Sequence, residues 1–372
     1  MNKRILITGG AGFIGSHLAD ELHKLGYQVR VLDSLLSQVH GSAGKKPDYL
    51  NPEVDLIVGD IQNPKIVRRA LEGVDAVYHL AAAVGVGQSM YEISKYTHIN
   101  NAGTAVLLQE LTDRPVERLV VASSMSIYGE GLYCTPDGVI CTAVDRNLKQ
   151  LKEGRWELYN EKGEQLIPIP TPETKTPTLA SVYALSKYDQ EQMSLIVGRA
   201  YNIPTVALRF FNVYGPRQAL SNPYTGVLAI FASRLLNNQP PLIYEDGFQR
   251  RDFVSVHDIV QALYLALVVP DATGRVFNVG SGRAYTVREI AEHVARVLGK
   301  EHIQPKITHK YRIGDIRHCF ADISLAARIL GYKPRITLEV GLVELANWLE
   351  GQVAVDYVTR AQAELDARRL TV

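Results

Sequence analysis

Residues 4–15 read Arg4-Ile5-Leu6-Ile7-Thr8-Gly9-Gly10-Ala11-Gly12-Phe13-Ile14-Gly15, a short apolar run followed at once by closely spaced glycines. The apolar run is typical of a buried parallel strand. A helical pattern through Leu18 and Leu22 follows the glycines. In this strand–turn–helix context the glycines allow the backbone to approach a pyrophosphate, which then lies on the helix N-terminus. The stretch therefore predicts the first unit of a doubly wound sheet that binds a dinucleotide.

A second strand is predicted at Val29–Leu32, and it ends in Asp33, about twenty residues after the glycine turn. A carboxylate at this position can accept hydrogen bonds from a ribose diol. The same negative charge would repel a 2′-phosphate, so the sequence favours NAD over NADP.

Five more strand-like runs follow, at residues 54–58, 76–80, 118–122, 205–209 and 276–279. Strands alternating with helical segments predict an α/β fold, a Rossmann-type doubly wound parallel sheet with a smaller C-terminal α/β domain for the substrate. The expected division is a NAD-binding domain at 1–210 plus 253–282 with an insertion at 130–178, a substrate domain at 211–252 plus 283–350, and a helical tail at 351–372.

Composition excludes several classes of protein. The 372 residues are 46% hydrophobic and carry a net charge of +1, with charges well mixed, so no nucleic-acid surface is indicated. The start has no signal-peptide layout, and no apolar run is long enough to span a bilayer. Three cysteines do not form a disulfide framework, and Cys134 with Cys141 lacks the ligands of a zinc site. We expect a cytoplasmic protein with no membrane partner and no metal.

The chemistry is predicted at Ser181-Val182-Tyr183-Ala184-Leu185-Ser186-Lys187, where a helical run begins. Tyr183 and Lys187 are four residues apart, so their side chains share one helix face. A free phenol has a pKa near ~10 and is a poor base at neutral pH. A neighbouring ammonium lowers a pKa by roughly 1–3 units, and an oxidised nicotinamide would add a second positive charge. Alone, the pair is more typical of an ordinary amphipathic helix with a surface tyrosine and lysine, and only the motifs below reverse this interpretation.

Polar residues also follow the predicted strands, at the edge where a doubly wound sheet binds its ligand. Asp60 and Ile61 are expected near the adenine end, and Ala81 and Ala82 beside the middle of the cofactor. Ser123, Ser124 and Ser126 end the strand at 118–122, so a hydroxyl there can bond a substrate oxygen beside the tyrosine. His79 is interpreted as a buried structural residue.

Together these motifs resemble the extended short-chain dehydrogenase/reductase family, and within it the nucleotide-sugar epimerases and dehydratases. The resemblance continues through Leu208–Arg217 and Arg251–Val254 to Gly314-Asp315, which is nearly the whole chain. It implies the catalytic trio Ser124, Tyr183 and Lys187. It implies cofactor contacts at Gly9, Gly12, Phe13, Ile14, Gly15, Asp33, Asp60, Ile61, Leu80, Ala81, Ala82, Asn100, Ser123, Tyr183 and Lys187. It implies substrate contacts at Ser124, Ser126, Asn212, Arg217, Leu242, Tyr244, Arg251, Arg312 and Asp315.

Departures from the family pattern narrow the expected reaction. The dehydratases place an Asp-Glu pair after the catalytic hydroxyl, and the 3,5-epimerising members place a cysteine where this chain has Ser126. Here the two positions are Met125 and Ser126, so a second proton-transfer pair is missing. The resemblance therefore implies an NAD-dependent 4-epimerase of nucleoside-diphosphate sugars. The insertion, expected to be a flap beside the substrate mouth, is similar to that of bacterial members acting on dTDP-L-rhamnose and dTDP-6-deoxy-L-talose.

Two alternatives stay open at this point. One is a nucleotide-sugar reductase or dehydrogenase that releases its nicotinamide, and the other is a non-catalytic dinucleotide-sensing protein. The family precedent also implies a homodimer built from helices near Tyr96–Leu111 and Val182–Tyr201. The tail is expected to have only a packing or solvated role.

Overall fold

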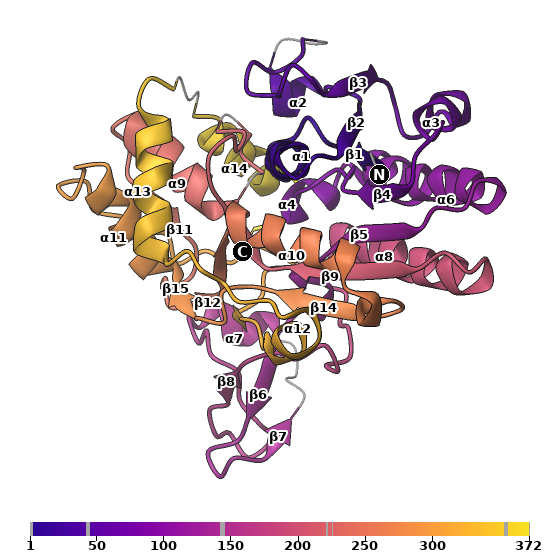
Figure 1. The fold of residues 1–372 in the computed structure, drawn as a ribbon. Helices are drawn as coiled ribbons and strands as arrows, with labels where there is room; N and C mark the ends of the chain where they lie inside the picture. Colours follow the sequence, from indigo (N-terminus) through magenta and orange to yellow (C-terminus); the bar gives the residue numbers. More distant parts are fainter. Residues whose placement is uncertain are drawn as a thin grey trace.

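The computed structural model describes residues 3–41, 45–141, 146–220, 222–224, 226–352 and 356–371. Its centre is a seven-stranded sheet with strand order β14-β9-β5-β4-β1-β2-β3, and every pairing in this sheet is parallel (Figure 1). The strands are β1 (Arg4–Thr8), β2 (Gln28–Asp33), β3 (Asp55–Val58), β4 (Ala76–His79), β5 (Arg118–Ser124), β9 (Thr205–Phe210) and β14 (Val276–Val279). Because β1 lies between β2 and β4, the strand order reverses there and a crevice opens beyond the carboxyl ends. The predicted Rossmann-type fold is confirmed.

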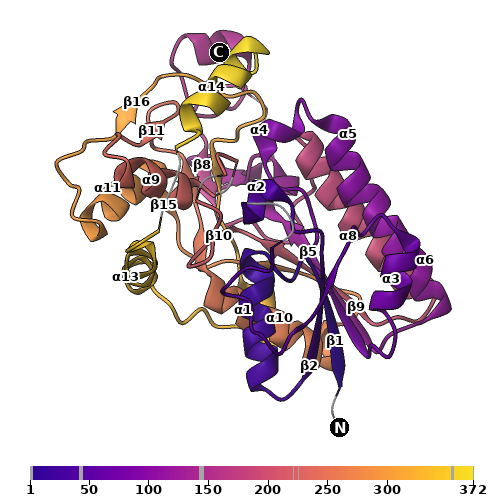
Figure 2. The same ribbon diagram turned by 90° about the horizontal axis from the view of Figure 1, so that it is seen from above.

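Helices cover both faces of this sheet, as Figure 2 shows from above. One face carries α1 (Phe13–Lys24), α10 (Val256–Val268) and α12 (Ser324–Leu330). The other carries α3 (Pro64–Ala70), α6 (Gly103–Asp113) and α8 (Val182–Ala200). Short helices α2 (Ser37–His40), α4 (Val86–Ser89) and α5 (Ile93–Tyr96) follow β2 and β4, and a π-helical turn η1 (Thr97–Ala102) joins α5 to α6. Apolar side chains of sheet and helices interlock in two layers, one on each face.

A second core lies between α9 (Val227–Leu236), α11 (Val287–Val297) and α13 (Leu338–Leu349). Small sheets extend it: β10 (Asn212–Tyr214) with β13 (Phe253–Ser255), β11 (Leu242–Ile243) with β16 (Lys306–Ile307), and β12 (Arg250–Arg251) between β15 (Tyr285–Thr286) and β17 (His318–Cys319). The described residues also include the 3-10 turns η2 (Met125–Tyr128), which follows β5, and η3 (Pro270–Ala272), which follows α10. This part is the smaller domain that the sequence predicts.

One detail differs from the predicted division into domains. The run at 253–256 forms β13, which pairs with β10 outside the seven-stranded sheet but packs Val254 into the core of the first domain. The range 283–350 was assigned to the substrate domain, but Ala326 and Leu330 of α12 pack into the core under the large sheet. The chain therefore crosses between the two domains more often than the sequence suggested.

The insertion at 130–178 forms a small unit of its own at the bottom of Figure 1. It consists of β6 (Leu132–Cys134), β7 (Ile140–Cys141), α7 (Leu148–Lys152) and β8 (Ile167–Ile169), with β6 between the other two strands. A buried arginine, Arg317, forms ion pairs both with this unit and with the substrate domain. The Arg317 guanidinium lies 2.6 Å from Glu157 of the insertion and 2.8 Å from Glu245. Its described residues do not line the cavity described below, but Arg146 bonds Glu245 and the Asp315 carbonyl oxygen, which do, so a flap beside the substrate mouth stays a prediction.

The tail ends in α14 (Val358–Ala367), which lies near α4 in Figure 2. Among the described residues, no helix combines the length and the apolar character that crossing a membrane requires.

Candidate active site

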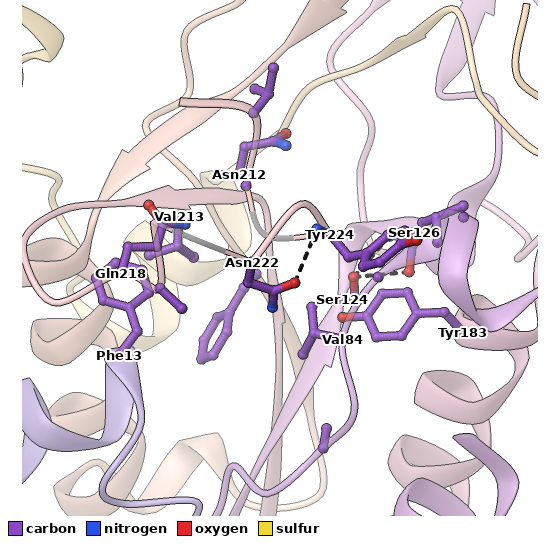
Figure 3. A pocket seen from close by; sticks show the side chains of 18 of the residues that line it. Phe13, Val84, Ser124, Ser126, Tyr183, Asn212, Val213, Gln218, Asn222 and Tyr224 are labelled. Atoms are coloured by element: carbon purple, nitrogen blue, oxygen red, sulfur yellow. Dashed lines mark hydrogen bonds between the residues drawn. The ribbon is translucent and has the colours of Figure 1, made fainter. Parts of the chain in front are cut away.

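A cavity of about 670 Å³ lies at the carboxyl edge of the large sheet and continues into the second domain (Figure 3). The predicted site residues that line it are Gly9, Gly12, Phe13, Ile14, Gly15, Asp33, Asp60, Ile61, Leu80, Ala81, Ala82, Ser123, Ser124, Ser126, Tyr183, Lys187, Asn212, Arg217, Leu242, Tyr244, Arg251, Arg312 and Asp315. The structure thus gathers residues from both domains around one space, which is large enough for a small-molecule ligand.

The glycine turn between β1 and α1 is too tight for side chains. Gly9 has φ of +70°, and a β-carbon there would lie 2.8 Å from the backbone nitrogen of Ala81. A β-carbon at Gly15 would lie 2.5 Å from the Gly9 carbonyl oxygen. The bare backbone at the start of α1 consequently faces the cavity, an arrangement that fits a pyrophosphate.

The carboxylate of Asp33 is fixed beside this turn. It accepts hydrogen bonds from the backbone N–H of Ala11 at 3.0 Å and of Leu35 at 2.9 Å. The His40 Nε2 atom lies 3.6 Å from the same carboxylate. Tyr49 donates a hydrogen bond to the Ala11 carbonyl oxygen at 3.0 Å. A carboxylate held in this way suits the ribose diol of NAD, as predicted.

The catalytic candidates meet where β5 ends and α8 begins. Ser181 caps α8 by accepting a hydrogen bond from Ala184 N–H at 3.1 Å, which places Tyr183 in the first helical turn. The Ser124 hydroxyl accepts bonds from the Ser126 hydroxyl at 2.9 Å and from the Ser126 N–H at 3.2 Å. With both acceptor positions occupied, Ser124 directs its own proton to the Tyr183 phenol, with which it shares a hydrogen bond. Figure 3 shows the Ser124 and Tyr183 side chains facing each other.

Lys187 lies one turn further along α8 and is 4% exposed. Its ammonium donates to the Gln190 side-chain oxygen at 2.6 Å. Burial lowers the pKa of Lys187 to about 7, although the nearby Glu191 carboxylate opposes this change. Burial raises the pKa of Tyr183 above its ordinary value, and the hydrogen bond from Ser124 offsets this only in part.

These directions correct the expected electrostatics. The sequence predicted that Lys187 would lower the pKa of Tyr183 without ionising it fully and that an oxidised nicotinamide would supply the rest. In the protein alone, burial instead raises that pKa and the phenol is neutral. The physical reason is that both groups are desolvated and that the ammonium is bonded to Gln190 instead of supporting a phenolate. Ionisation of Tyr183 therefore needs positive charge that the chain does not itself supply.

Two buried polar residues, His79 at the end of β4 and Asn100 in η1, have structural roles. His79 lies between Thr8 and Thr104, with 2.8 Å from each ring nitrogen to a threonine hydroxyl, and burial lowers its pKa to about 3. This agrees with its interpretation as a buried structural residue. Asn100, predicted to contact the cofactor, is fully buried and absent from the cavity wall. Its amide bonds the Ala83 backbone at 2.7 and 3.1 Å and the Ser186 hydroxyl at 2.9 Å, so it supports the loop after β4.

The second domain presents groups that can hold an anion. Arg251 donates to the carbonyl oxygens of Ile316 and Arg317 at 2.5 and 2.8 Å, and it has no ion-pair partner among the residues that the structure describes. The side-chain oxygen of Asn212 is buried and unpaired. Arg312 is already paired with Asp315, at 2.6 and 3.0 Å, and lies over the ring of Tyr244. A diphosphate would meet the unpaired charge of Arg251 first.

Arg217, predicted to contact the substrate, lies on the cofactor side of the cavity. Its guanidinium pairs with Asp20 of α1 at 2.8 Å and covers the ring of Tyr49, 5.5 Å from its centroid. One of its terminal nitrogens is buried without a partner. This position supports a contact with the cofactor and not with the substrate.

Several lining residues were not predicted from the sequence. They are Val84, Gly85, Val86 and Gly87 after β4, Gln218, Ala219, Asn222, Pro223 and Tyr224 before α9, Gln249, and Val358, Ala361, Gln362 and Leu365 of α14. Most are small or apolar residues without a motif. The segment containing Tyr224 carried a weak signal, since it belongs to a block that resembled the bacterial members with the same insertion.

The fold and the site together define an NAD-dependent enzyme of the extended short-chain type. A family model described as "NAD dependent epimerase/dehydratase family" matches residues 5–149 and 156–280. A dTDP-L-rhamnose 4-epimerase from Burkholderia thailandensis is 34% identical over 93% of this chain and 95% of its own. The chain therefore belongs to the NAD-dependent epimerase/dehydratase family, and its cofactor is NAD.

Solved structures agree with this assignment. The UDP-glucose 4-epimerase of Thermotoga maritima, determined with UDP-glucose, has a TM-score of 0.75 and 30% identity over 94% of this chain and 99% of that one. The UDP-glucose 4-epimerase of Thermus thermophilus, determined with NAD, has a TM-score of 0.74 and 29% identity over 94% of this chain and 100% of that one.

Proposed function

We propose that the protein inverts C4 of the sugar in a nucleoside-diphosphate sugar. The observation that carries this proposal is the Ser124–Tyr183 hydroxyl pair beside the cavity, with Met125 and Ser126 in place of a second acid and base. Inversion at C4 through a 4-keto sugar needs only one proton-transfer group together with a hydride carrier. The site contains one such proton-transfer group, Tyr183, and its cofactor NAD is the hydride carrier.

NAD, when bound, supplies the site that accepts the C4 hydride and returns it. Tyr183 takes the proton of the sugar 4-hydroxyl and gives it back when the 4-keto group is reduced. Ser124 donates a hydrogen bond to the same sugar oxygen and steadies the charge that develops on it. Because burial holds the phenol neutral in the protein alone, Tyr183 becomes a base only when positive charge is placed beside it. Base catalysis is thereby coupled to the oxidised cofactor.

The sugar must present both faces in turn, so it cannot be gripped by its ring. Arg251 and the side-chain NH2 group of Asn212 donate to the diphosphate, and Arg312 can join them if it releases part of its pairing with Asp315. Guanidinium groups bind phosphate oxygens in a bidentate way, so this grip leaves the sugar free to turn. Leu242 and Tyr244 then lie along the nucleotide end of the cavity.

The expected substrates are dTDP-L-rhamnose and dTDP-6-deoxy-L-talose. Two observations support this choice: the similarity to the enzyme from Burkholderia thailandensis, and the apolar residues Val84, Val86 and Leu365 in the cavity wall. A 6-deoxy sugar has a methyl group that can rest on such a wall without leaving a hydroxyl unpaired. UDP-glucose and UDP-glucuronate are the comparison substrates.

The test is to incubate the purified protein with each nucleotide sugar, with no added cofactor, and to follow isomer formation. An epimerase converts the nucleotide sugar to the equilibrium mixture of isomers without added cofactor. A reductase or dehydrogenase stops once the nicotinamide cofactor that was purified with the protein has been consumed. Tyr183→Phe should keep NAD but lose at least about 100-fold in kcat, the scale of one acid–base group. Lys65→Met, at an exposed position, is the control. Near-normal turnover by Tyr183→Phe would refute the mechanism.

The homodimer and the cytoplasmic location stay predictions. On α8, Met193 packs inward against the sheet, while Leu185 and Ile196 are 45% and 58% exposed. These exposed residues support the helix pairing expected from the family. Sedimentation of the wild type beside Ile196→Glu would test it, since a charge at a paired face should release monomers.

A further inference from the structure

The C-terminal helix α14 forms part of the cavity wall. Val358, Ala361, Gln362 and Leu365 line the cavity, and their spacing places them on one face of the helix. Ala361 and Leu365 are 7% and 4% exposed. This face carries no charged residue, although the helix as a whole is rich in charges. The tail was expected to have only a packing or solvated role, and the structure gives it a place at the site.

Leu365 lies close to Arg312, one of the residues proposed to bind the diphosphate, and to α4, which contacts the catalytic helix. A β-carbon built on Gly87 of α4 would lie 3.6 Å from both the Leu365 side chain and the Arg312 guanidinium. Two residues further along α4, the Ser89 hydroxyl accepts a hydrogen bond from the Tyr183 N–H at 3.0 Å. Leu365 and Arg312 therefore both lie beside Gly87 of α4, the helix whose last residue bonds the start of the catalytic helix.

Contacts from both domains hold α14 in this position. Glu364 accepts hydrogen bonds from Tyr91 of the first domain at 3.0 Å and from Tyr224 at 3.4 Å, and the two phenols also contact each other. Arg368 covers the ring of Tyr91, 4.4 Å from its centroid. Beyond the helix, the Leu370 carbonyl accepts from the Ile313 N–H at 2.9 Å. The helix therefore spans the two domains across the cavity.

We propose that α14 is a substrate-binding element, in which Leu365 and Ala361 pack against the uncharged sugar of the nucleotide sugar while Glu364 positions the helix. This inference rests on the proposed function for the nature of the ligand. It assigns part of the specificity for the sugar to the apolar wall that the C-terminal helix forms. Because the wall is apolar, a sugar carrying a carboxylate would be desolvated there without a partner and should bind poorly.

The test compares Leu365→Ala with Leu365→Met, which keeps the volume of the side chain, and with Arg360→Ala, which changes an exposed position on the same helix. Every protein in this comparison also carries Tyr183→Phe, which blocks turnover, and calorimetric titration of the NAD-loaded proteins uses dTDP-L-rhamnose, dTDP, UDP-glucose and UDP. Leu365→Ala should weaken binding of the tighter nucleotide sugar roughly tenfold, the scale of one buried leucine contact. It should change the affinity for the matching nucleoside diphosphate less than about twofold, and Leu365→Met should restore most of the loss.

Unchanged affinity of Leu365→Ala for the nucleotide sugar, or an equal loss for the diphosphate without sugar, would overturn the proposal. Because binding is measured without turnover, its failure is separate from that of the proposed function. A protein that shows the predicted difference in binding but forms no isomer would retain this wall and lose the epimerase assignment. A protein that epimerises the sugar, but whose affinity for it is unchanged by Leu365→Ala, would keep the epimerase assignment and lose this wall.

Discussion

Replacing Lys187 with methionine is expected to stabilise the cofactor-free protein near neutral pH while abolishing turnover. Lys187 is buried, and its pKa in the folded protein is about 7, against 10.5 for the free side chain. Between these two values the unfolded chain binds more protons than the folded one, so the stability of the wild type rises with pH in this window. Below pH 7 the full cost of burying the ammonium is present.

The size of the effect follows from these values. One pKa unit corresponds to about 1.36 kcal/mol, so the buried ammonium costs about 4 kcal/mol at pH 7 and about 2 kcal/mol at pH 9. Methionine removes this cost but also removes the donor to the Gln190 oxygen, and a buried acceptor left without a partner costs about 1–3 kcal/mol. The net gain of Lys187→Met is therefore about 1–3 kcal/mol at pH 7, and it falls to about zero near pH 9.

The assay is urea unfolding of cofactor-free wild type, Lys187→Met and the exposed control Lys65→Met at pH 6.5, 7.5, 8.5 and 9.5. Subtracting the wild type at each pH removes the titration of every other group. A difference for Lys187→Met that stays constant with pH, or a variant less stable than the wild type at pH 6.5, would refute the burial argument. Lys65→Met should show little difference at any pH.

Three further predictions concern other parts of the molecule. Arg317→Met should destabilise the protein by about 3–5 kcal/mol at neutral pH, because the buried Glu245 and the half-buried Glu157 lose this partner. Arg288→Met, at an exposed pair, should cost under about 1 kcal/mol. The loss caused by Arg317→Met should shrink below pH 4.5 in thermal unfolding, since bonds from His318 and Arg317 hold the pKa of Glu157 at about 2 against the effect of burial, and the wild type loses that contribution as the pH falls. Arg251→Met should weaken binding of a nucleoside diphosphate about 10- to 100-fold in calorimetry, and equal affinity would contradict its assignment to the phosphates. Asp33→Asn should weaken NAD binding about tenfold or more and narrow the preference over NADP, both measured by fluorescence titration.

The sequence predicted the parts of the site that depend on local spacing. The glycine turn, the carboxylate of Asp33 after β2, and the helical pair of Tyr183 and Lys187 are each fixed by residues close together in the chain. Strands β1 and β14 could be predicted because four and three consecutive residues, most of them apolar, are buried in a parallel sheet. These features need no knowledge of distant contacts.

Other features depend on contacts that no local pattern reveals. The strands β10 and β13 have three residues each, which is too short for a periodicity to show their pairing. Asn100 has a side-chain type suited to a ligand, yet its amide is taken by the Ala83 backbone. The neutral state of Tyr183 follows from burial, and burial exists only after the domains assemble. The position of Leu365 depends on packing between the tail and α4.

The strand β14 and the helix α12 have a consequence for how the protein is made. Both complete the core of the first domain, yet they leave the ribosome only after much of the second domain has been synthesised. Until residues 276–279 emerge, β9 is an unpaired sheet edge of the kind that invites association between nascent chains. Fragments that end before β14 should therefore aggregate on expression, and the two domains cannot be produced as separate soluble pieces by one cut in the gene.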